Sequence, residues 1–514
     1  MVKSKLLKIN ERDNAAVLLD NVAGGETLVL EGMVLIAGED IEKGHKIAVR
    51  DIACGEDVIK YGFPIGYATK AINAGEHIHT HNIRTKLKGL SEYSYNPDAN
   101  GKSHMQGMPD PYGADAAAAA GKPEAYEFMG YVRENGEIGI RNEIWIVNTV
   151  GCVNKTAELI AAEANIRFAG RTDGIFAFPH PYGCSQLGDD HKATQKILAD
   201  MVKHPNAAGV LVLGLGCENN NIAEFKKILG EYNPDRVKFL AAQEAEDEIE
   251  AGLELLDSLV AYAGSSKREK CPISRLIVGL KCGGSDAFSG ITANPLLGAF
   301  TDMLTAMGGT GILTEVPEMF GAETILMDRC VNEEVFNKTV GLINNFKRYF
   351  IRHDQEIYEN PSPGNKKGGI STLEEKSLGC IQKGGTGKVS QVLSYGERST
   401  TPGLNLLEGP GNDIVASTAL MAAGAHIVLF TTGRGTPLGT AVPTVKVSSN
   451  SDLYNRKRNW IDYNGGQLLE GRGLAEVKKE FLEYILKVAS NELKTQNEKN
   501  GYREIAIFKD GVTL

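Results

Sequence analysis

The chain has 514 residues, with 65 acidic and 55 basic side chains and a formal net charge of −10. This length predicts two to four domains with buried cores, and the mild acidity argues against nucleic acid or an anionic membrane surface as the main partner. Hydrophobic residues make up 42% and charged residues 23%, values typical of an ordered globular protein and not of a disordered one.

The N-terminal sequence MVKSKLLKIN lacks the apolar core of a signal peptide. No run of residues approaches the ~18 apolar residues that a membrane span needs. The eight cysteines are too few for a disulfide framework, and none forms a CxxC pair. We therefore expect a cytoplasmic protein.

Residues 1–95 predict a compact, mostly β module. Short β-type runs at 27–30, 45–49 and 57–59 alternate with turns that contain glycine. The stretch 96–124 contains four prolines and a run of alanines, which predicts a linker.

After the linker the pattern changes to strand, loop and helix in repeated order. Alternation of apolar β runs with amphipathic helices predicts parallel sheets covered by helices. We expect an α/β fold in which the small β domain precedes two α/β domains, 125–270 and 271–514. The segment 474–490 has apolar residues at helical spacing and predicts a core-packing helix. The apolar β runs are 143–148, 174–178, 209–215, 275–280 and 426–430.

In open α/β sheets, ligands bind beyond the carboxyl ends of the strands. Four loops at such places carry a cysteine beside a glycine: Cys152, Cys184, Cys217 and Cys282. Two interpretations stay open. These residues are small buried thiols, or some of them bind iron or an iron–sulfur cluster, because thiolate suits soft transition metals.

Polar side chains share these loops. His180 and Tyr182 precede Cys184, Lys281 and Asp286 flank Cys282, and Glu315 lies at another expected strand end. Arg434 stands between glycines, where a guanidinium is well placed to pair with a carboxylate. The alternative for Arg434 is a turn residue packed on a neighbouring loop.

The β module contains three alternating histidines, His77, His79 and His81, in the segment EHIHTHN. Alternate residues of a strand point to one face, so the three imidazoles would converge. Imidazole is the commonest ligand for divalent transition metals. The alternative is a surface histidine cluster without a ligand.

Nucleotide-binding motifs are absent from the sequence. GLGCEN lacks the third glycine of a dinucleotide fingerprint, and GGTGKV has Val389 where a phosphate-binding loop needs Ser or Thr. Nucleotide-dependent chemistry is therefore disfavoured.

Together these motifs resemble the altronate/galactarate dehydratase family, to which the sulfolactate sulfo-lyases are related. Residues 11–95 are similar to the small β-clip (SAF) domain that begins these enzymes, and the resemblance extends over nearly the whole chain. HPYGCSQLGDDH with GLGCENN is closer to the altronate branch than to the galactarate branch. The further motifs are GYVRENGEIGIRN, TVGCVNKTAELIA, LKCGGSDAFSGITANP and PGNDIVASTALMAAGAHIVLFTTGRGTP.

The resemblance implies loss of water from D-altronate to give 2-dehydro-3-deoxy-D-gluconate in hexuronate breakdown, with Fe²⁺ or Mn²⁺ required. A divalent metal would stabilise the enediolate that forms when the C2 proton leaves. A base takes that proton, and an acid protonates the departing C3 hydroxyl. We also expect a homo-oligomer, most simply a dimer.

On this basis we assign hypothetical roles. His180 is the first candidate for base or acid, with Glu315 or Lys281 as its partner. The candidate substrate-binding residues are Arg434, Arg141, Asn142, Tyr182 and Asp286. The candidate metal ligands are His77, His79, His81, Cys184, Cys217 and Cys282.

Three alternative functions stay open. One is dehydration of galactarate or another sugar acid. Another is an iron–sulfur dehydratase in which three of the four loop cysteines hold the cluster. The third is a non-catalytic sensor that binds a sugar acid.

Overall fold

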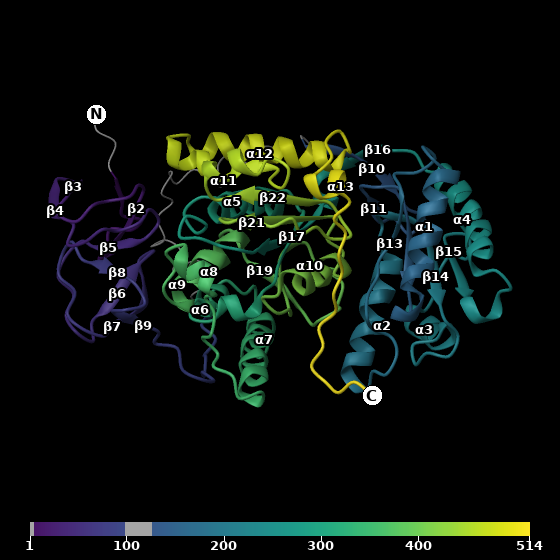
Figure 1. The fold of residues 1–514 in the computed structure, drawn as a ribbon, viewed down its shortest axis with the longest axis horizontal. Coiled ribbons are helices and arrows are strands. Elements are labelled where there is room, and N and C mark those ends of the chain that lie inside the picture. The colour runs from purple at the N-terminus through teal and green to yellow at the C-terminus, as the bar shows by residue number, and fades with distance from the viewer. Residues whose placement is uncertain (1–4, 98–125) are drawn as a thin grey trace.

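A computed structural model describes residues 5–97 and 126–514 of the chain. Figure 1 shows three bodies in a row: the purple β domain at one end, a large green and yellow α/β domain in the centre, and a blue to teal α/β domain at the other end. The α/β fold with a small N-terminal β domain is thus confirmed. From residue 98 onward, the predicted linker lies outside the described residues.

Short antiparallel strands build the N-terminal domain. They form a four-stranded sheet in the order β1-β2-β5-β8, a three-stranded sheet β6-β7-β9 and the hairpin β3-β4. The strands are β1 (Leu6–Leu7), β2 (Ala15–Leu18), β3 (Thr27–Leu30), β4 (Met33–Ile36), β5 (Lys46–Ala48), β6 (Asp57–Lys60), β7 (Phe63–Ala68), β8 (His77–Ile78) and β9 (Ile83–Arg84).

The next domain is built on a parallel sheet in the order β13-β12-β14-β15, beside a small antiparallel sheet β11-β10-β16. Its elements are β10 (Glu127–Val132), β11 (Ile138–Gly139), β12 (Glu143–Asn148), α1 (Asn154–Arg167), β13 (Ile175–Ala177), α2 (Gly188–Lys203), β14 (Ala207–Gly214), α3 (Ile222–Leu229), β15 (Val237–Ala241), α4 (Glu248–Gly264) and β16 (Glu269–Pro272).

Helices cover both faces of this sheet, which explains why its strands are continuously apolar. Ile144 and Ile146 of β12 belong to a buried cluster with residues of α1 and α4. Trp145 and Val147 belong to a cluster with residues of α2 and α3. Alternate side chains of one strand thus pack on opposite helical layers.

The central domain contains a seven-stranded parallel sheet in the order β19-β20-β18-β17-β21-β22-β23. Its strands are β17 (Ile277–Cys282), β18 (Thr310–Leu313), β19 (Val389–Leu393), β20 (Gly403–Leu407), β21 (Ile427–Thr432), β22 (Thr444–Ser448) and β23 (Tyr463–Asn464). Its helices are α5 (Ala293–Ala306), α6 (Glu323–Met327), α7 (Glu333–Arg352), α8 (Pro363–Lys367), α9 (Leu373–Cys380), α10 (Asp413–Ala422), α11 (Ser451–Arg456), α12 (Leu474–Ala489) and α13 (Gln496–Asn500).

The predicted C-terminal helix is confirmed as α12, and Val477, Phe481 and Ile485 are fully buried on its inner face. A single hydrophobic cluster joins Ile65 of the β domain to Leu373 of α9. Among the described residues, no helix is both long enough and apolar enough to cross a membrane.

We expect Leu211→Ala in β14 to lower the free energy of unfolding of the four-stranded-sheet domain by about 2 to 5 kcal/mol, because Leu211 is fully buried and its loss leaves a cavity. The matched control is Leu159→Ala in α1, where the side chain is 57% exposed, with an expected change within about 0.5 kcal/mol. Urea denaturation followed by the fluorescence of Trp145, which is buried in the same sheet, measures both. Equal effects of the two substitutions would contradict this packing.

Candidate functional site

A cavity of about 550 Å³ opens at the carboxyl edge of the seven-stranded sheet. Cys282 ends β17, Glu318 lies just after β18, and Asp413 begins α10 after β20; all three line the cavity. The segment 359–366 forms another wall. A second cavity, of about 540 Å³, lies beside Arg236, which precedes β15. We take the first cavity as the candidate site, because ligands of parallel sheets bind at the carboxyl edge.

Lys281 and Glu315, which the sequence indicates as alternative partners of His180, contact each other beside this cavity. The Lys281 ammonium forms ion pairs with Glu315 and, at 2.9 Å, with Asp413. The second oxygen of Glu315 accepts hydrogen bonds from Lys383 at 2.8 Å and from the Cys282 amide at 3.0 Å. Glu315 has a φ of 70°, which is uncommon for a residue with a side chain. These bonds hold the carboxylate in place at this conformation.

Two thiols and a carboxylate lie next to this pair. The sulfurs of Cys282 and Cys380 are 3.3 Å apart, and Cys380 donates to Glu318 at 3.0 Å. These three ligand atoms are close enough to one another to surround one metal ion. However, Lys383 already donates to the Cys282 sulfur at 2.9 Å, and Lys376 to Glu318 at 2.9 Å. With two ammonium groups in contact, the arrangement favours an ion network of protein groups over a bound cation.

The pKa shifts in this network keep its groups in defined protonation states. Burial opposes ionisation of Glu318, but Lys376, Lys281 and Lys383 outweigh it and lower the pKa of Glu318 to about 2. Burial also opposes the charge of Lys376, yet Glu318 raises the pKa of this lysine. The hydrogen bond with the Cys282 sulfur, together with burial, raises the pKa of Cys380. At neutral pH the cavity therefore presents carboxylates and ammonium groups, and Cys380 is a neutral thiol.

One buried carboxylate is central to the contact between the β domain and the central domain. Glu375 of α9 accepts from Lys46 of β5 at 2.9 Å and from Lys60 of β6 at 2.8 Å, and all three side chains are at most 1% exposed. Burial opposes ionisation of Glu375, but the two lysines lower its pKa to about 2. Lys46 also donates to Gly369 O and to Ser371 Oγ.

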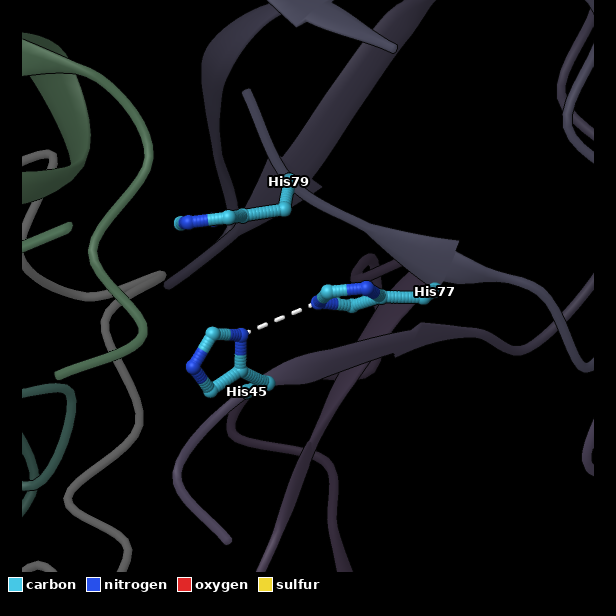
Figure 2. Close-up of side chains that lie close together, drawn as sticks. All are labelled: His45, His77 and His79. Carbon is cyan, nitrogen blue, oxygen red and sulfur yellow. Dashed lines mark hydrogen bonds between the residues drawn. The ribbon is translucent and has the colours of Figure 1, made fainter. Parts of the chain in front are cut away.

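Three histidines of the β domain gather at this contact, as Figure 2 shows. His45 Nδ1 and His77 Nε2 are 2.9 Å apart, and the rings of His77 and His79 stack with centroids 5.5 Å apart. His79 Nδ1 lies 2.9 Å from Ser371 Oγ, and His45 Nε2 lies 3.4 Å from Lys367 O. Burial and the neighbouring histidines lower the pKa of His77 to about 3. Burial, with Lys46 and His45, lowers the pKa of His79 to about 4.

The strand predicted over 77–81 is wrong, because β8 ends at Ile78. Asn82 causes the change: its side chain accepts from the His79 amide at 2.9 Å and donates to His77 O at 2.8 Å, which closes a turn. His81 is exposed, and its ring lies 5.3 Å from that of His77. The histidines still converge, but through a turn and with His45 of another strand as a member.

This histidine cluster fits a metal ion. One ring nitrogen from each of His45, His77 and His79 lies within 4.8 Å of the others. A second set combines His77 and His81 with Glu39. Neutral imidazole nitrogens are borderline-soft donors that suit iron and zinc. Iron is the neighbour of manganese in the divalent series.

The structure places His180 outside the cavity. It follows β13 in the other parallel sheet, and it is 2% exposed. Its Nδ1 accepts from the Tyr182 amide at 3.1 Å, so Nε2 carries the proton that is donated to Asn148 O at 2.8 Å. Both ring nitrogens are thus used by the backbone, and neither is left for Glu315 or Lys281. Tyr182 stacks on His180, and its hydroxyl accepts from the Ile507 amide.

Arg141 and Asn142 precede β12 and therefore lie at the amino-terminal edge of the four-stranded sheet. Arg141 is fully buried and pairs with both oxygens of Glu498, at 2.7 and 3.1 Å. Asn142 donates to Ala263 O and accepts from Arg133. These contacts are structural, and the structure does not bring either residue to the candidate site.

Arg434 and Asp286 lie on the loops around the seven-stranded sheet. Arg434 is exposed. Its Nε would lie 3.7 Å from a Cβ built on Gly364, and the residues on either side of Gly364 in the chain line the cavity. None of the ion pairs between described residues includes Arg434. Asp286 is held by Ser289, Ser449 and Asn450. Arg434 thus stays available at the rim, whereas Asp286 is occupied.

The four loop cysteines divide between the two sheets. Cys282 is buried, as one interpretation of the sequence predicts. That interpretation is wrong for Cys152, Cys184 and Cys217, which are exposed and follow neighbouring strands of the four-stranded sheet. No single site therefore joins all four.

Sequence reasoning missed several members of the candidate site, namely His45, Glu318, Glu375, Lys376, Cys380, Lys383 and Asp413. Most lie far along the chain from the motifs that they contact, for example Lys46 and Glu375. Asp413 ends the segment PGND, which follows a strand end. The rule that ligands bind beyond the carboxyl ends of strands, which indicated Glu315, could also have indicated Asp413.

Three family models match consecutive parts of the chain. They are described as the altronate/galactarate dehydratase SAF domain (residues 4–86), the D-galactarate dehydratase/altronate hydrolase second domain (130–264) and the D-galactarate/altronate dehydratase C-terminal domain (273–513). The histidine cluster lies in the first match, and the cavity at the seven-stranded sheet lies in the third.

Curated relatives match over the full length. The chain is 54% identical to an altronate dehydratase of Bacillus subtilis (strain 168) and 52% identical to an altronate dehydratase of Escherichia coli (strain K12), in each case over 99% of both chains. It is 33% identical to the galactarate dehydratase (L-threo-forming) of Escherichia coli (strain K12), over 98% of this chain and 96% of that one.

Glu375→Gln is expected to lower the free energy of unfolding by about 3 to 5 kcal/mol, because it leaves two buried ammonium groups without their carboxylate. The ordinary pKa of 4.5 falls to about 2 on folding. The advantage of the wild type is therefore complete above about pH 4.5 and shrinks as the pH falls toward 2. Chemical denaturation between pH 3 and 7 measures the difference. Glu334→Gln, which removes an exposed partner of Lys338, is the control and should change little; a pH-independent deficit for Glu375→Gln would contradict the assignment.

Proposed function

This chain belongs to the altronate/galactarate dehydratase family, and we propose that it removes water from D-altronate to give 2-dehydro-3-deoxy-D-gluconate. Membership makes it a sugar-acid dehydratase, a hydro-lyase. The observation that carries the choice of altronate is the much higher full-length identity with the two altronate dehydratases than with the galactarate dehydratase. This step would belong to hexuronate breakdown.

The reaction needs a base for the proton at C2. We assign this role to Asp413, which lines the cavity and whose side chain is 37% exposed, so a substrate can reach its free oxygen. Lys281 and Glu315 are positioning residues in this scheme: Glu315 fixes the Lys281 ammonium, and the ammonium orients Asp413. His180 takes no part, because the backbone occupies both of its ring nitrogens.

The departing C3 hydroxyl needs a proton donor. Lys376 is the buried ammonium on the cavity wall, where it bonds Glu318 and Asn360 at 2.9 Å. Its proton goes to the hydroxyl as the C3–oxygen bond breaks, and water leaves. The enol that remains becomes the 2-keto acid when carbon takes up a proton. Arg434 at the rim would bind the substrate carboxylate through paired N–H groups.

We assign the required metal, Fe²⁺ or Mn²⁺, to His45, His77 and His79. When bound, the ion would stabilise the negative charge that develops on the substrate carboxylate as the C2 proton leaves. The placement is supported by the segment that links the two places: residues 359–366 line the cavity, and Lys367 and Ser371 directly after it contact His45 and His79. The expected homodimer and the cytoplasmic location stay predictions.

The function is tested by anaerobic incubation with D-altronate and Fe²⁺, with detection of the 2-keto-3-deoxy product. We expect product from altronate, much less from galactarate, and loss of product on addition of a chelator. If galactarate alone reacts, the proposed substrate is wrong and the dehydratase chemistry stands. Ligand-induced stabilisation without turnover of either acid would favour a sensor.

His77→Ala is expected to raise the dissociation constant for Mn²⁺ by more than about tenfold, because one of three nitrogen donors is lost. Calorimetric titration of the protein without substrate measures it, so the result does not depend on activity. His353→Ala is the matched control, since His353 is half-exposed and pairs with Asp510 instead. Unchanged affinity in His77→Ala would exclude this cluster as the metal site.

Asp413→Asn is expected to lower kcat by about 10²- to 10⁴-fold, the usual contribution of general base catalysis. Exchange of the C2 proton with deuterated solvent should fall with it. Asp452→Asn is the control, because Asp452 also lies in the first turn of a helix but pairs with Lys43 at the surface. Full C2 exchange in Asp413→Asn would remove Asp413 from the scheme.

A further inference from the structure

Three exposed cysteines lie along one edge of the four-stranded sheet, and none of them has a role in the scheme above. Strands β13, β12 and β14 are neighbours and parallel, so their carboxyl ends share an edge. Cys184, Cys152 and Cys217 follow these three strands within seven residues of the strand ends. Free cysteine is among the most buried residue types, yet these three are exposed, and Cys54 of the β domain is the other exposed cysteine of the chain.

Hydrogen bonds fasten the three loops to one another. The Gly151 amide, beside Cys152, donates to Tyr182 O at 2.9 Å. The loop of Cys217 reaches both others through Asn220, whose amide donates to Gly183 O and whose side chain donates to Thr149 O, each at 3.0 Å. The three thiols are therefore carried by one rigid unit and not by independent loops.

Glycines allow the backbones to come this close. A Cβ on Gly183 would lie 1.9 Å from Thr149 O, and a Cβ on Gly151 would lie 2.6 Å from His180 O. Any side chain at either position would push the loops of Cys152 and Cys184 apart. Each of these glycines is directly next to its cysteine, so the close approach fixes the backbone positions from which these two thiols extend.

The thiols have only weak partners. Gln243 donates to the Cys217 sulfur at 3.6 Å, and Ser185 donates to the Cys184 sulfur at 3.9 Å. The C-terminal segment borders the same place, because the Leu514 amide donates to Ser185 O at 2.9 Å. Three exposed thiols on loops that are bonded to one another, with two polar hydrogen-bond donors beside them, form a set of soft ligands whose main bonds are not made within the protein.

A single ion does not fit this trio. The three sulfurs are not all within 4.8 Å of one another, in contrast to the histidines and to the set of Cys282, Glu318 and Cys380. An iron–sulfur cluster fits sulfurs that are farther apart, because each of its irons needs only one protein sulfur. Thiolates are the ligands of such clusters, and hydrogen bonds to their sulfurs tune them.

We propose that Cys152, Cys184 and Cys217 bind a four-iron iron–sulfur cluster at this edge of the sheet. Each thiol gives up its proton when it ligates an iron. Three protein ligands leave the fourth iron open to an oxygen ligand from solvent or a small molecule. This site is separate from the histidines and from the cavity of the seven-stranded sheet, and it does not depend on the function proposed above.

The test is anaerobic reconstitution of the full chain with iron(III), sulfide and excess dithiothreitol, which reduces part of the iron. The wild type should gain broad absorbance near about 400 nm and about four irons and four acid-labile sulfides per chain. Cys152→Ala, Cys184→Ala and Cys217→Ala should each lose most of the absorbance and sulfide, with unchanged circular dichroism and Tm. Cys54→Ala, the matched exposed cysteine, should keep both.

The proposal is wrong if the reconstituted wild type contains no acid-labile sulfide. It is also wrong if all three cysteine variants retain as much sulfide as the wild type. His77→Ala should retain the sulfide and absorbance, because iron held by the histidines brings no sulfide. A colourless wild type that still dehydrates altronate with Fe²⁺ would overturn this cluster and leave the proposed function intact. A protein that binds the cluster but turns over no sugar acid would support the cluster and contradict the proposed function.

Discussion

The contact of Lys46 and Lys60 with Glu375 is the interaction on which the candidate site depends. It binds the β domain to α9 through charges that are almost fully removed from water. One carboxylate between two ammonium groups leaves an excess positive charge, and burial lowers the pKa of Lys46 to about 8. The same contact positions Ser371, which meets His79. It acts together with the hydrophobic cluster that joins Ile65 to Leu373 and with the hydrogen bonds from Thr85 and Lys86 to Glu374.

The central cavity is built on a related principle. Glu315, Glu318 and Asp413 carry as many charges as Lys281, Lys376 and Lys383, so the buried network is neutral in sum. Such a network holds its side chains in fixed places, because breaking any pair leaves an uncompensated charge in a medium of low dielectric. A polar, anionic substrate would meet preoriented groups there at little cost of reorganisation.

The two parallel sheets divide the chemistry of the chain. The seven-stranded sheet carries charged side chains at its carboxyl edge, whereas the four-stranded sheet carries thiols held by glycine-rich loops. Both follow the rule that polar groups gather beyond the carboxyl ends of parallel strands. The difference between the edges lies in the loops and in the last residues of the strands: β14 is apolar along its whole length, whereas β17 ends in Lys281 and Cys282.

The fold class and the alternation of strands and helices after the β domain could be predicted from the sequence alone. Apolar runs such as 143–148 and the helical spacing of 474–490 depend only on neighbours in the chain, so they can be read locally. Lys281 and Glu315 could each be predicted as candidates, because both lie at strand ends, but only as alternative partners of His180 and not as a pair. Which loops meet depends on how the sheets and domains pack. The backbone occupies both ring nitrogens of His180, which excludes it from the role that its loop predicts. His45, from another strand, lies beside His77. Side chains such as Lys46 and Glu375 are 329 residues apart, and no local pattern encodes a contact over that separation, because it forms only when the domains pack.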